Sequence, residues 1–197
     1  MKIGLYFGSF NPVHNGHLII ANYALNNTDL EEIWFVVSPL NPFKQSNMLL
    51  NGNHRIELVK TALNGEKHIK ASNIEFKLSK PSYTANTLAH LTEKYPGHVF
   101  SILMGSDGFQ NIEKWKNASY ILKNFSIYIY KRPGFEFTPI DNASTHIISG
   151  PLLEISASFI RRQIAEKKSI RYYVPDLVME MIEENLFYHS KIENSDF

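Results

Sequence analysis

Short apolar runs alternate with segments of helical periodicity along most of the chain. Continuous apolar runs, which are typical of parallel strands covered on both faces, lie at 3–7, 33–37 and 99–104. Alternating apolar positions predict further strands at 74–78, 125–129 and 147–148. Apolar residues at helical spacing predict helices over 16–26, 55–63, 84–95 and 175–185. This order of elements predicts an α/β fold in which an open parallel sheet carries helices on both faces.

Length and composition fit one domain. The 197 residues are enough for a substantial core, and contents of 44% hydrophobic and 20% charged residues are ordinary for a globular protein. The absence of cysteine excludes disulfides, thiolate metal sites and cysteine nucleophiles. We expect a single domain over 1–190 with a small helical C-terminal part, followed by a flexible polar tail over 191–197.

Charge and the start of the chain bear on partners and compartment. A net charge of +1 gives no support for a nucleic-acid or membrane surface, so neither partner is expected. The first residues lead directly into a predicted core strand, and no apolar run approaches the length of a membrane span. The expected compartment is therefore the cytoplasm, and a homo-oligomer stays open.

The segment between the first strand and the first helix carries the densest candidate chemistry. It contains the turn Gly8-Ser9-Phe10-Asn11-Pro12 and two histidines, His14 and His17. In an open α/β sheet, ligands bind at the carboxyl ends of the strands, and a helix N-terminus favours anions. Residues three apart share one side of a helical turn, so both histidines can point at one phosphate chain. A zinc site is the alternative, but no third ligand of suitable spacing accompanies the pair.

A second candidate anion site lies near the C-terminus. Ser156 and Ser158 come just before a helical pattern, where hydroxyl and free N–H groups can bind an anion. Arg161 falls one turn into that helix, and its planar guanidinium could reach the β- and γ-phosphates of a nucleotide. Lys44 could reach the same phosphates. The structural alternatives are a plain N-cap for Ser156, a solvated helix face for Arg161 and a surface lysine for Lys44.

Two motifs resemble the signatures of the nucleotidylyltransferase superfamily, whose members transfer a nucleoside monophosphate from a nucleoside triphosphate. The first is Gly8-Ser9-Phe10 followed by His14-x-Gly16-His17, and the second is a Ser/Thr-x-x-Arg motif within 155–161. The resemblance implies a Rossmann-like sheet. It also implies three catalytic residues, which are His14, His17 and Arg161. The ATP site that it implies is formed by Gly8, Ser9, Phe10, Lys44, Arg132, Ile155, Ser156 and Ser158.

The middle of the chain resembles bacterial nicotinate mononucleotide adenylyltransferases more narrowly. The matching segments are Pro81-Ser82-Tyr83-Thr84-Ala85-Asn86-Thr87-Leu88, Gly105-Ser106-Asp107 with the later Trp115, Arg132-Pro133-Gly134 and Leu186-Phe187-Tyr188. The resemblance implies that Tyr83, Thr84 and Trp115 bind the pyridine ring and its carboxylate. It implies that Asp107 binds ribose hydroxyls or orients a magnesium ion, with a helix N-cap as the alternative. Arg132 faces the adenosine end of ATP or braces a turn, and a core position is the alternative for Trp115.

Several positions depart from the pattern of that family. Phe7 replaces a glycine, Asn11 and Asn86 replace acidic residues, and Phe43 replaces a histidine. The Gly-Ser-Phe-Asn-Pro form is also similar to that of eukaryotic-type enzymes, which accept nicotinamide mononucleotide. None of these changes touches the predicted catalytic residues, so they bear on the preference between acid and amide.

The sequence therefore predicts an enzyme of NAD biosynthesis that transfers AMP from ATP to nicotinate mononucleotide and releases pyrophosphate. The phosphate of the acceptor attacks directly, ATP is the co-substrate, and Mg²⁺ is expected to be held by phosphates and water, without dedicated protein ligands. Its partners are small-molecule substrates. Three alternatives stay open: a nicotinamide mononucleotide or dual-specificity adenylyltransferase, a pantetheine-phosphate adenylyltransferase, and a non-catalytic nucleotide-binding regulator.

Overall fold

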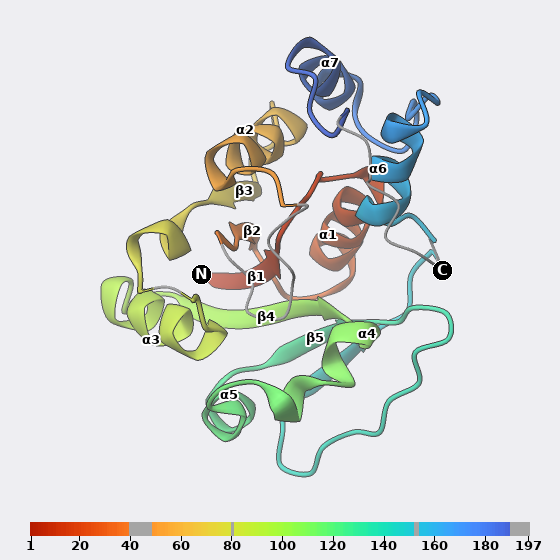
Figure 1. Cartoon of the computed structure of the whole chain (residues 1–197). Helices are drawn as coiled ribbons and strands as arrows, with labels where there is room; N and C mark the ends of the chain where they lie inside the picture. The colour runs from red at the N-terminus through yellow and green to blue at the C-terminus, as the bar shows by residue number, and fades with distance from the viewer. Residues whose placement is uncertain (40–48, 80, 152–153, 190–197) are drawn as a thin grey trace.

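The computed structural model describes residues 1–39, 49–79, 81–151 and 154–189 (Figure 1). Lys44 and Phe43, and the predicted tail over 191–197, lie outside the described residues. The strands are β1 Lys2–Gly8, β2 Glu32–Val37, β3 Ile69–Ser72, β4 Val99–Gly105, β5 Ile127–Tyr130 and β6 Thr145–Ile148. The α-helices are α1 Asn15–Asn27, α2 Gly52–Ala62, α3 Thr84–Lys94, α4 Ser106–Phe109, α5 Ala118–Asn124, α6 Ala157–Ala165 and α7 Asp176–Glu184. Two short 3₁₀ helices are η2 Ile74–Lys77 and η3 Ile112–Lys114.

The six strands form one sheet in the order β3-β2-β1-β4-β5-β6, and every neighbouring pair is parallel. From β1 the chain moves outward to β2 and β3, then returns to the other side of β1 with β4. The strand order therefore reverses between β1 and β4, which is the point where open α/β sheets bind ligands. The prediction of a Rossmann-like parallel sheet is confirmed.

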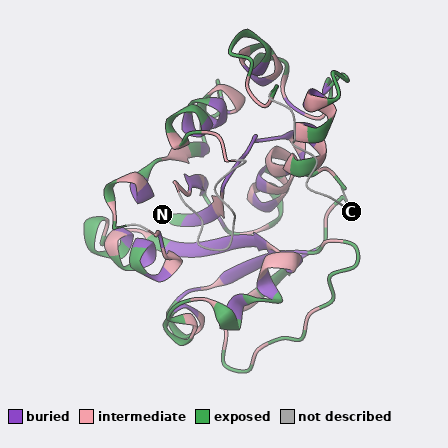
Figure 2. Cartoon of the chain, viewed as in Figure 1, coloured by how far each residue is buried: buried purple, intermediate pink, exposed green. Residues whose placement is uncertain are grey.

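Helices cover both faces of the sheet (Figure 1). One core cluster joins the sheet to α1, α2, α6 and α7, and a second joins it to α3, α4 and α5. Figure 2 shows that the strands are buried while the outer helix faces are exposed. The continuous apolar runs at 3–7, 33–37 and 99–104 arise because strands between two helical layers bury both of their faces.

Two of the predicted strands differ from the structure. The region 74–78 is no strand, since Ile74–Lys77 form η2 and Leu78 is its C-cap, and the edge strand β3 precedes it at Ile69–Ser72. Ile74 packs in the second core cluster, whereas Phe76 packs against the first. The alternating apolar positions of this segment therefore arise from its contacts with two core clusters, and not from pairing with a neighbouring strand. Phe125 is the C-cap of α5, a helix that the sequence did not predict, and β5 begins only at Ile127.

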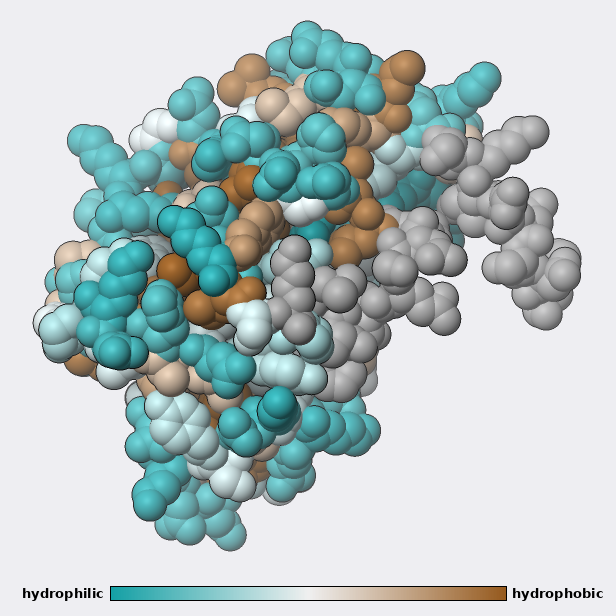
Figure 3. Space-filling view, turned by 60° about the vertical axis from the view of Figure 1, so that its left-hand side comes forward, coloured by the Kyte–Doolittle hydropathy of each residue, from teal (hydrophilic) through white to brown (hydrophobic). Residues whose placement is uncertain are grey.

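Figure 3 shows one face of the molecule. That face is largely hydrophilic, with hydrophobic residues in several small patches. Within the described residues, no helix combines the length and the apolar character that crossing a bilayer requires.

Candidate active site

A cavity of about 630 Å³ opens at the carboxyl ends of β1 and β4, where the strand order reverses. Segments that are far apart in the sequence line it: the turn after β1, the start of α1, α4, the loop after β5 and the start of α6. Most of the predicted site residues line it, namely Gly8, Ser9, Phe10, His14, His17, Asp107, Trp115, Arg132, Ile155, Ser156, Ser158 and Arg161. Tyr83 and Thr84 do not line it.

The two histidines stack against each other at the N-terminus of α1. His14 is the N-cap residue in an extended conformation, and its backbone N–H donates to His17 Nδ1 at 3.2 Å. The ring centroids lie 3.6 Å apart with an interplanar angle of 25°. Because Nδ1 accepts a hydrogen bond, the neutral His17 ring carries its proton on Nε2. His17 is thereby fixed as a donor.

His14 is the more deeply buried of the two. Burial, together with a smaller effect of the positive charge of Arg132, lowers its pKa from 6.5 to about 3. The ring is therefore neutral when no anion is bound. A phosphate group beside it would favour the protonated form and raise the pKa again.

The glycine between the histidines is required by the stacked rings. A Cβ atom at Gly16 would lie 3.0 Å from His14 Nδ1 and 3.5 Å from Ile155 Cβ. A side chain there would press the His14 ring away from its stacked position. The H-x-G-H spacing thus has a steric cause in addition to its chemistry.

Arg161 connects the C-terminal motif to the turn after β1. Its Nη1 donates to the main-chain carbonyl of Asn11 at 2.7 Å, and its Nη2 donates to Ser158 Oγ at 3.1 Å. Ser156 is the N-cap of α6, with its hydroxyl accepting from Phe159 N at 3.2 Å. Ser158 lies inside the first turn of α6, so its predicted place before the helix is wrong. The turn after β1 and the N-terminus of α6 therefore face one cavity.

Asp107 and Arg132 form an ion pair at the opposite wall, with Arg132 Nη1 3.0 Å from Asp107 Oδ2. Asp107 lies in the first turn of α4, and the N-cap of that helix is Gly105, so the N-cap alternative for Asp107 is wrong. The backbone N–H of Arg132 donates to Ser106 Oγ at 3.0 Å, which braces the loop after β5. A Cβ atom at Gly105 would lie only 2.3 Å from Asp107 Oδ1. A side chain at 105 would therefore displace the Asp107 carboxylate from this position.

Trp115 both lines the cavity and packs against the second core cluster. It is the C-cap residue of η3, and Lys116 follows it. The Nζ atom of Lys116 lies 4.3 Å from the centroid of the Tyr83 ring, a distance at which a cation and an aromatic face attract. Tyr83 and Thr84 form the N-cap and first residue of α3, beside the Trp115 end of the cavity.

Comparisons with known proteins agree with this geometry. Residues 5–163 match the family described as cytidylyltransferase-like. The chain belongs to that family. It is 48% identical over 191 residues to the "Probable nicotinate-nucleotide adenylyltransferase" of Flavobacterium johnsoniae, which covers 95% of this chain and 99% of the relative. It is 40% identical over 185 residues to the protein of the same name from Bacteroides thetaiotaomicron, covering 93% of this chain and 92% of the relative.

A solved structure shares the fold of this cytidylyltransferase-like chain. It is the Plasmodium falciparum nicotinic acid mononucleotide adenylyltransferase complexed with NaAD, with a TM-score of 0.81 and 22% identity. The match covers 98% of this chain and 99% of that one. The two proteins therefore share one architecture although few of their residues are identical.

Sequence reasoning did not assign a role to three residues around the turn of this cytidylyltransferase-like chain. Asn11 Oδ1 accepts from Leu50 N at 3.1 Å and from the Tyr188 hydroxyl at 3.0 Å. Arg55 donates to the carbonyl of Ser9 at 2.6 Å. The signal for Arg55 was its place on the apolar stripe of α2, four residues before Val59, where a solvated cation is not expected. Asn11 and Tyr188 had no signal beyond their membership of a motif.

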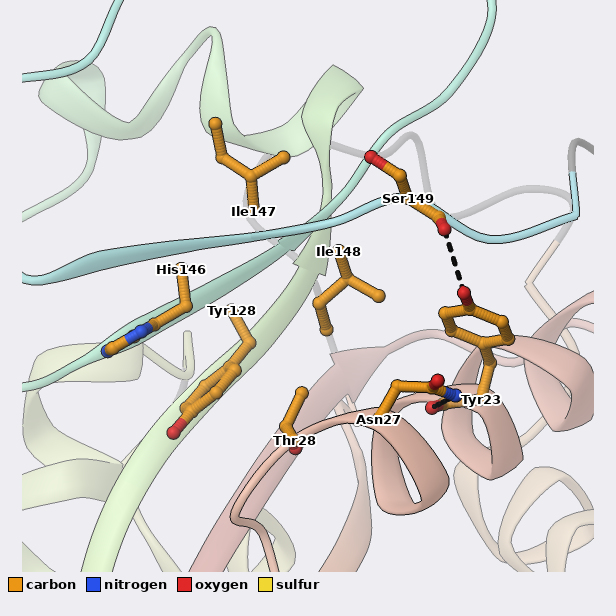
Figure 4. Close-up of a pocket in the computed structure, with 8 residues that line it drawn as sticks. All are labelled: Tyr23, Asn27, Thr28, Tyr128, His146, Ile147, Ile148 and Ser149. Carbon is orange, nitrogen blue, oxygen red and sulfur yellow. Dashed lines mark hydrogen bonds between the residues drawn. The ribbon is translucent and has the colours of Figure 1, made fainter.

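A second hollow, of about 400 Å³, lies between α1 and the β5–β6 edge of the sheet (Figure 4). The Tyr23 hydroxyl donates to the Ser149 carbonyl across it at 2.8 Å, and the rings of Tyr128 and His146 stack with centroids 4.7 Å apart. None of the predicted site residues lines this hollow. The candidate active site is therefore the cavity between β1 and β4.

Neither cavity holds a dedicated set of metal ligands in the described part of the chain. No group of three or more histidine, aspartate or glutamate side chains is arranged there to hold an ion. Asp107 is a carboxylate that lines the larger cavity, and it is paired with Arg132.

Proposed function

We propose that this chain transfers AMP from ATP to nicotinate mononucleotide, giving nicotinate adenine dinucleotide and pyrophosphate, as an enzyme of NAD biosynthesis. The observation that carries the proposal is the meeting of the two motifs in one cavity. Arg161 bonds the carbonyl of Asn11, while His14 and His17 stack beside it. Relatives that are 48% and 47% identical over nearly the whole chain bear the name of this activity.

The reaction needs no nucleophile from the protein. A phosphate oxygen of the mononucleotide attacks the α-phosphorus of ATP, a P–O bond forms, and the bond to the departing pyrophosphate breaks. Catalysis then consists of holding the two substrates in line and stabilising the negative charge on the α-phosphate and the leaving group. The chain supplies donors of the required kind in the cavity.

The phosphate donors come from both sides of the cavity. The fixed Nε2–H of His17 donates to a phosphate oxygen, and His14 gains a proton as the anion approaches. The free N–H groups at the start of α1 and α6 favour the same charge, because both helices point their N-termini at the cavity. Arg161 is the cation for the β- and γ-phosphates, together with Lys44.

Mg²⁺ fits this site as an ion carried by the nucleotide. The donor set around the cavity has a carboxylate, Asp107, which suits an octahedral ion that keeps most of its ligands as phosphate oxygens and water. The ion when bound reduces the negative charge of the triphosphate. Asp107 orients it or binds the ribose hydroxyls, and Arg132 faces the adenosine end of ATP.

The pyridine end of the acceptor is assigned to the wall that Trp115 forms. A flat, electron-poor ring suits the face of an indole, and the N-terminus of α3 with Tyr83 and Thr84 suits its carboxylate. This assignment requires Tyr83 and Thr84 to come into contact when substrate binds, since they do not line the cavity without it. We place the enzyme in the cytoplasm, with ATP and the mononucleotide as its partners.

The deciding experiment is pyrophosphate release with ATP and Mg²⁺. Nicotinate mononucleotide, nicotinamide mononucleotide and phosphopantetheine are compared as acceptors under the same conditions. A strong preference for nicotinate mononucleotide is expected. Equal use of acid and amide would reassign the chain to a dual-specificity enzyme, and activity only with phosphopantetheine would overturn the pyridine assignment. Nucleotide binding without turnover of any of the three acceptors would reassign the chain to the non-catalytic nucleotide-binding regulators.

A further inference from the structure

Arg55, in the first half of α2, is the largest side chain of the described residues that is fully buried. It bonds the turn that follows β1 and does not line the cavity. The proposed chemistry makes no use of it. A fully buried guanidinium is costly unless its donors and its charge are satisfied.

Within the described part of the chain, the Arg55 guanidinium donates to main-chain carbonyls only. Nη1 donates to Ser9 O at 2.6 Å and to Ser38 O at 2.8 Å. Nη2 donates to Pro39 O at 2.9 Å, and Nε donates to Leu50 O at 2.7 Å. One side chain therefore bonds three segments: the turn at 8–12, which we call the phosphate turn, the residues that follow β2, and the residue Leu50 that precedes α2.

The donors are thus satisfied, but the charge is not neutralised. Among the described residues, no carboxylate lies within 4.0 Å of Arg55. Burial lowers the pKa of Arg55, yet an arginine keeps its proton in a protein. Carbonyl dipoles offset part of the cost of burying the Arg55 cation. No negatively charged side chain among the described residues lies close enough to neutralise it.

The turn is held from two sides by two guanidinium groups. Arg55 bonds the carbonyl of Ser9 from behind, and Arg161 bonds the carbonyl of Asn11 from the cavity side. Both cations lower the pKa of the Tyr188 hydroxyl against the opposing effect of burial, so both lie near this hydroxyl, which donates to Asn11 Oδ1. Ser9 itself lines the cavity, and its hydroxyl is buried without a partner among the described residues.

We propose that Arg55 is a positioning residue of the triphosphate subsite. It holds the phosphate turn in shape through the Ser9 carbonyl, and its unneutralised charge attracts the β- and γ-phosphates from behind the turn. The bound polyphosphate is then the counter-charge that the protein lacks. This inference rests on the proposed function only in taking ATP as the ligand of the cavity.

The test separates charge from packing by direct binding, without turnover. Dissociation constants of ATP and of AMP are measured by calorimetry for the wild type, Arg55→Gln and Arg55→Lys. Glutamine keeps two N–H donors for the carbonyls but has no charge, whereas lysine keeps the charge but not the fork. Val59→Ala is the matched control, because Val59 is fully buried one turn further along α2 and carries no charge.

We expect Arg55→Gln to raise the dissociation constant of ATP by about tenfold or more, because only ATP carries the β- and γ-phosphates. The dissociation constant of AMP should change much less. Arg55→Lys should keep most of the ATP affinity, and Val59→Ala should change neither ligand. Equal weakening of ATP and AMP, or unchanged ATP binding in a folded Arg55→Gln protein, would overturn the proposal. Failure of Arg55→Gln to fold while Val59→Ala folds would also overturn it, since Arg55 would then be a structural residue alone.

The outcome is independent of the acceptor. If the wild type binds ATP but transfers AMP to none of the three acceptors, the proposed function fails while the role of Arg55 is still measured. If it turns over nicotinate mononucleotide and the charge of Arg55 has no effect on ATP, only the present inference fails.

Discussion

His17 accepts a hydrogen bond at Nδ1 from the backbone N–H of His14, and the two imidazole rings stack 3.6 Å apart. The second histidine is therefore held by the first, both through the main chain and through the ring face. Because Nδ1 accepts this hydrogen bond, the neutral His17 ring carries its proton on Nε2.

Loss of the His17 donor should slow the reaction without unfolding the protein. We expect His17→Ala to lower turnover by about 10²-fold or more, since a donor to a charge that develops in the transition state contributes on that scale. Steady-state pyrophosphate release measures the effect, with circular dichroism to verify the fold. His146→Ala, at the distant second hollow, is the control and should keep full activity. Normal turnover in a folded His17→Ala protein would remove His17 from the catalytic group.

The buried ring of His14 gives stability a defined dependence on pH. Its pKa is about 3 in the folded chain and ~6.5 in the unfolded one. Above both values neither state binds the proton, so stability is unaffected. As the pH falls from ~6.5 towards about 3, the His14 ring of the unfolded chain gains a proton that the native chain does not bind. The free energy of unfolding should then fall, by at most about 1.4 kcal/mol per pH unit.

Urea unfolding at several pH values between about 7.5 and about 5 measures this slope. The slope should be smaller in His14→Gln, which has no titrating ring. Equal slopes in the wild type and His14→Gln would mean that the His14 ring binds its proton equally well in the folded and unfolded chains, which contradicts the lowered pKa. Saturating ATP should also reduce the slope, because a phosphate beside His14 raises its pKa.

A methyl group at position 105 should disrupt the opposite wall of the cavity. The new Cβ of Gly105→Ala would lie 2.3 Å from Asp107 Oδ1 and 3.0 Å from Arg132 Cδ, so the Asp107 carboxylate has to leave its present position beside Arg132. We expect kcat/KM for ATP to fall by about tenfold or more. Gly97→Ala is a matched control, since its Cβ would meet no atom within 4 Å. Identical kinetics in the two variants would show that the Asp107–Arg132 pair has no part in catalysis.

Replacing Trp115 should change KM for the acceptor more than KM for the nucleotide. Because its ring is assigned to the pyridine, we expect Trp115→Ala to raise KM for nicotinate mononucleotide by about tenfold and KM for ATP far less. Trp34→Ala removes a tryptophan that does not line the cavity, and it controls for loss of packing alone. An equal rise in both KM values after Trp115→Ala would indicate a structural role in the second core cluster.

The local elements of this protein could be predicted from the sequence because each leaves a local pattern. Buried parallel strands are continuous apolar runs, and β1, β2 and β4 were found in this way. The region 74–78 was predicted wrongly because a 3₁₀ turn between two helical layers also alternates its apolar side chains. The short helices α4 and α5 were missed, since four to seven residues hold too few turns for a helical period to emerge.

The candidate site divides in the same way. The sequence by itself determined the histidine pair, the glycine between its members and the starts of the two helices, because these depend on residues within one turn of each other. Only the tertiary structure decided that Arg161 reaches Asn11, that Asp107 pairs with Arg132, and that Arg55 holds Ser9. Arg161 and Arg55 bond main-chain carbonyls, which every residue carries, so no residue type marks the partner. The third contact joins α4 to the loop after β5, and only the parallel pairing of β4 with β5 brings those segments together.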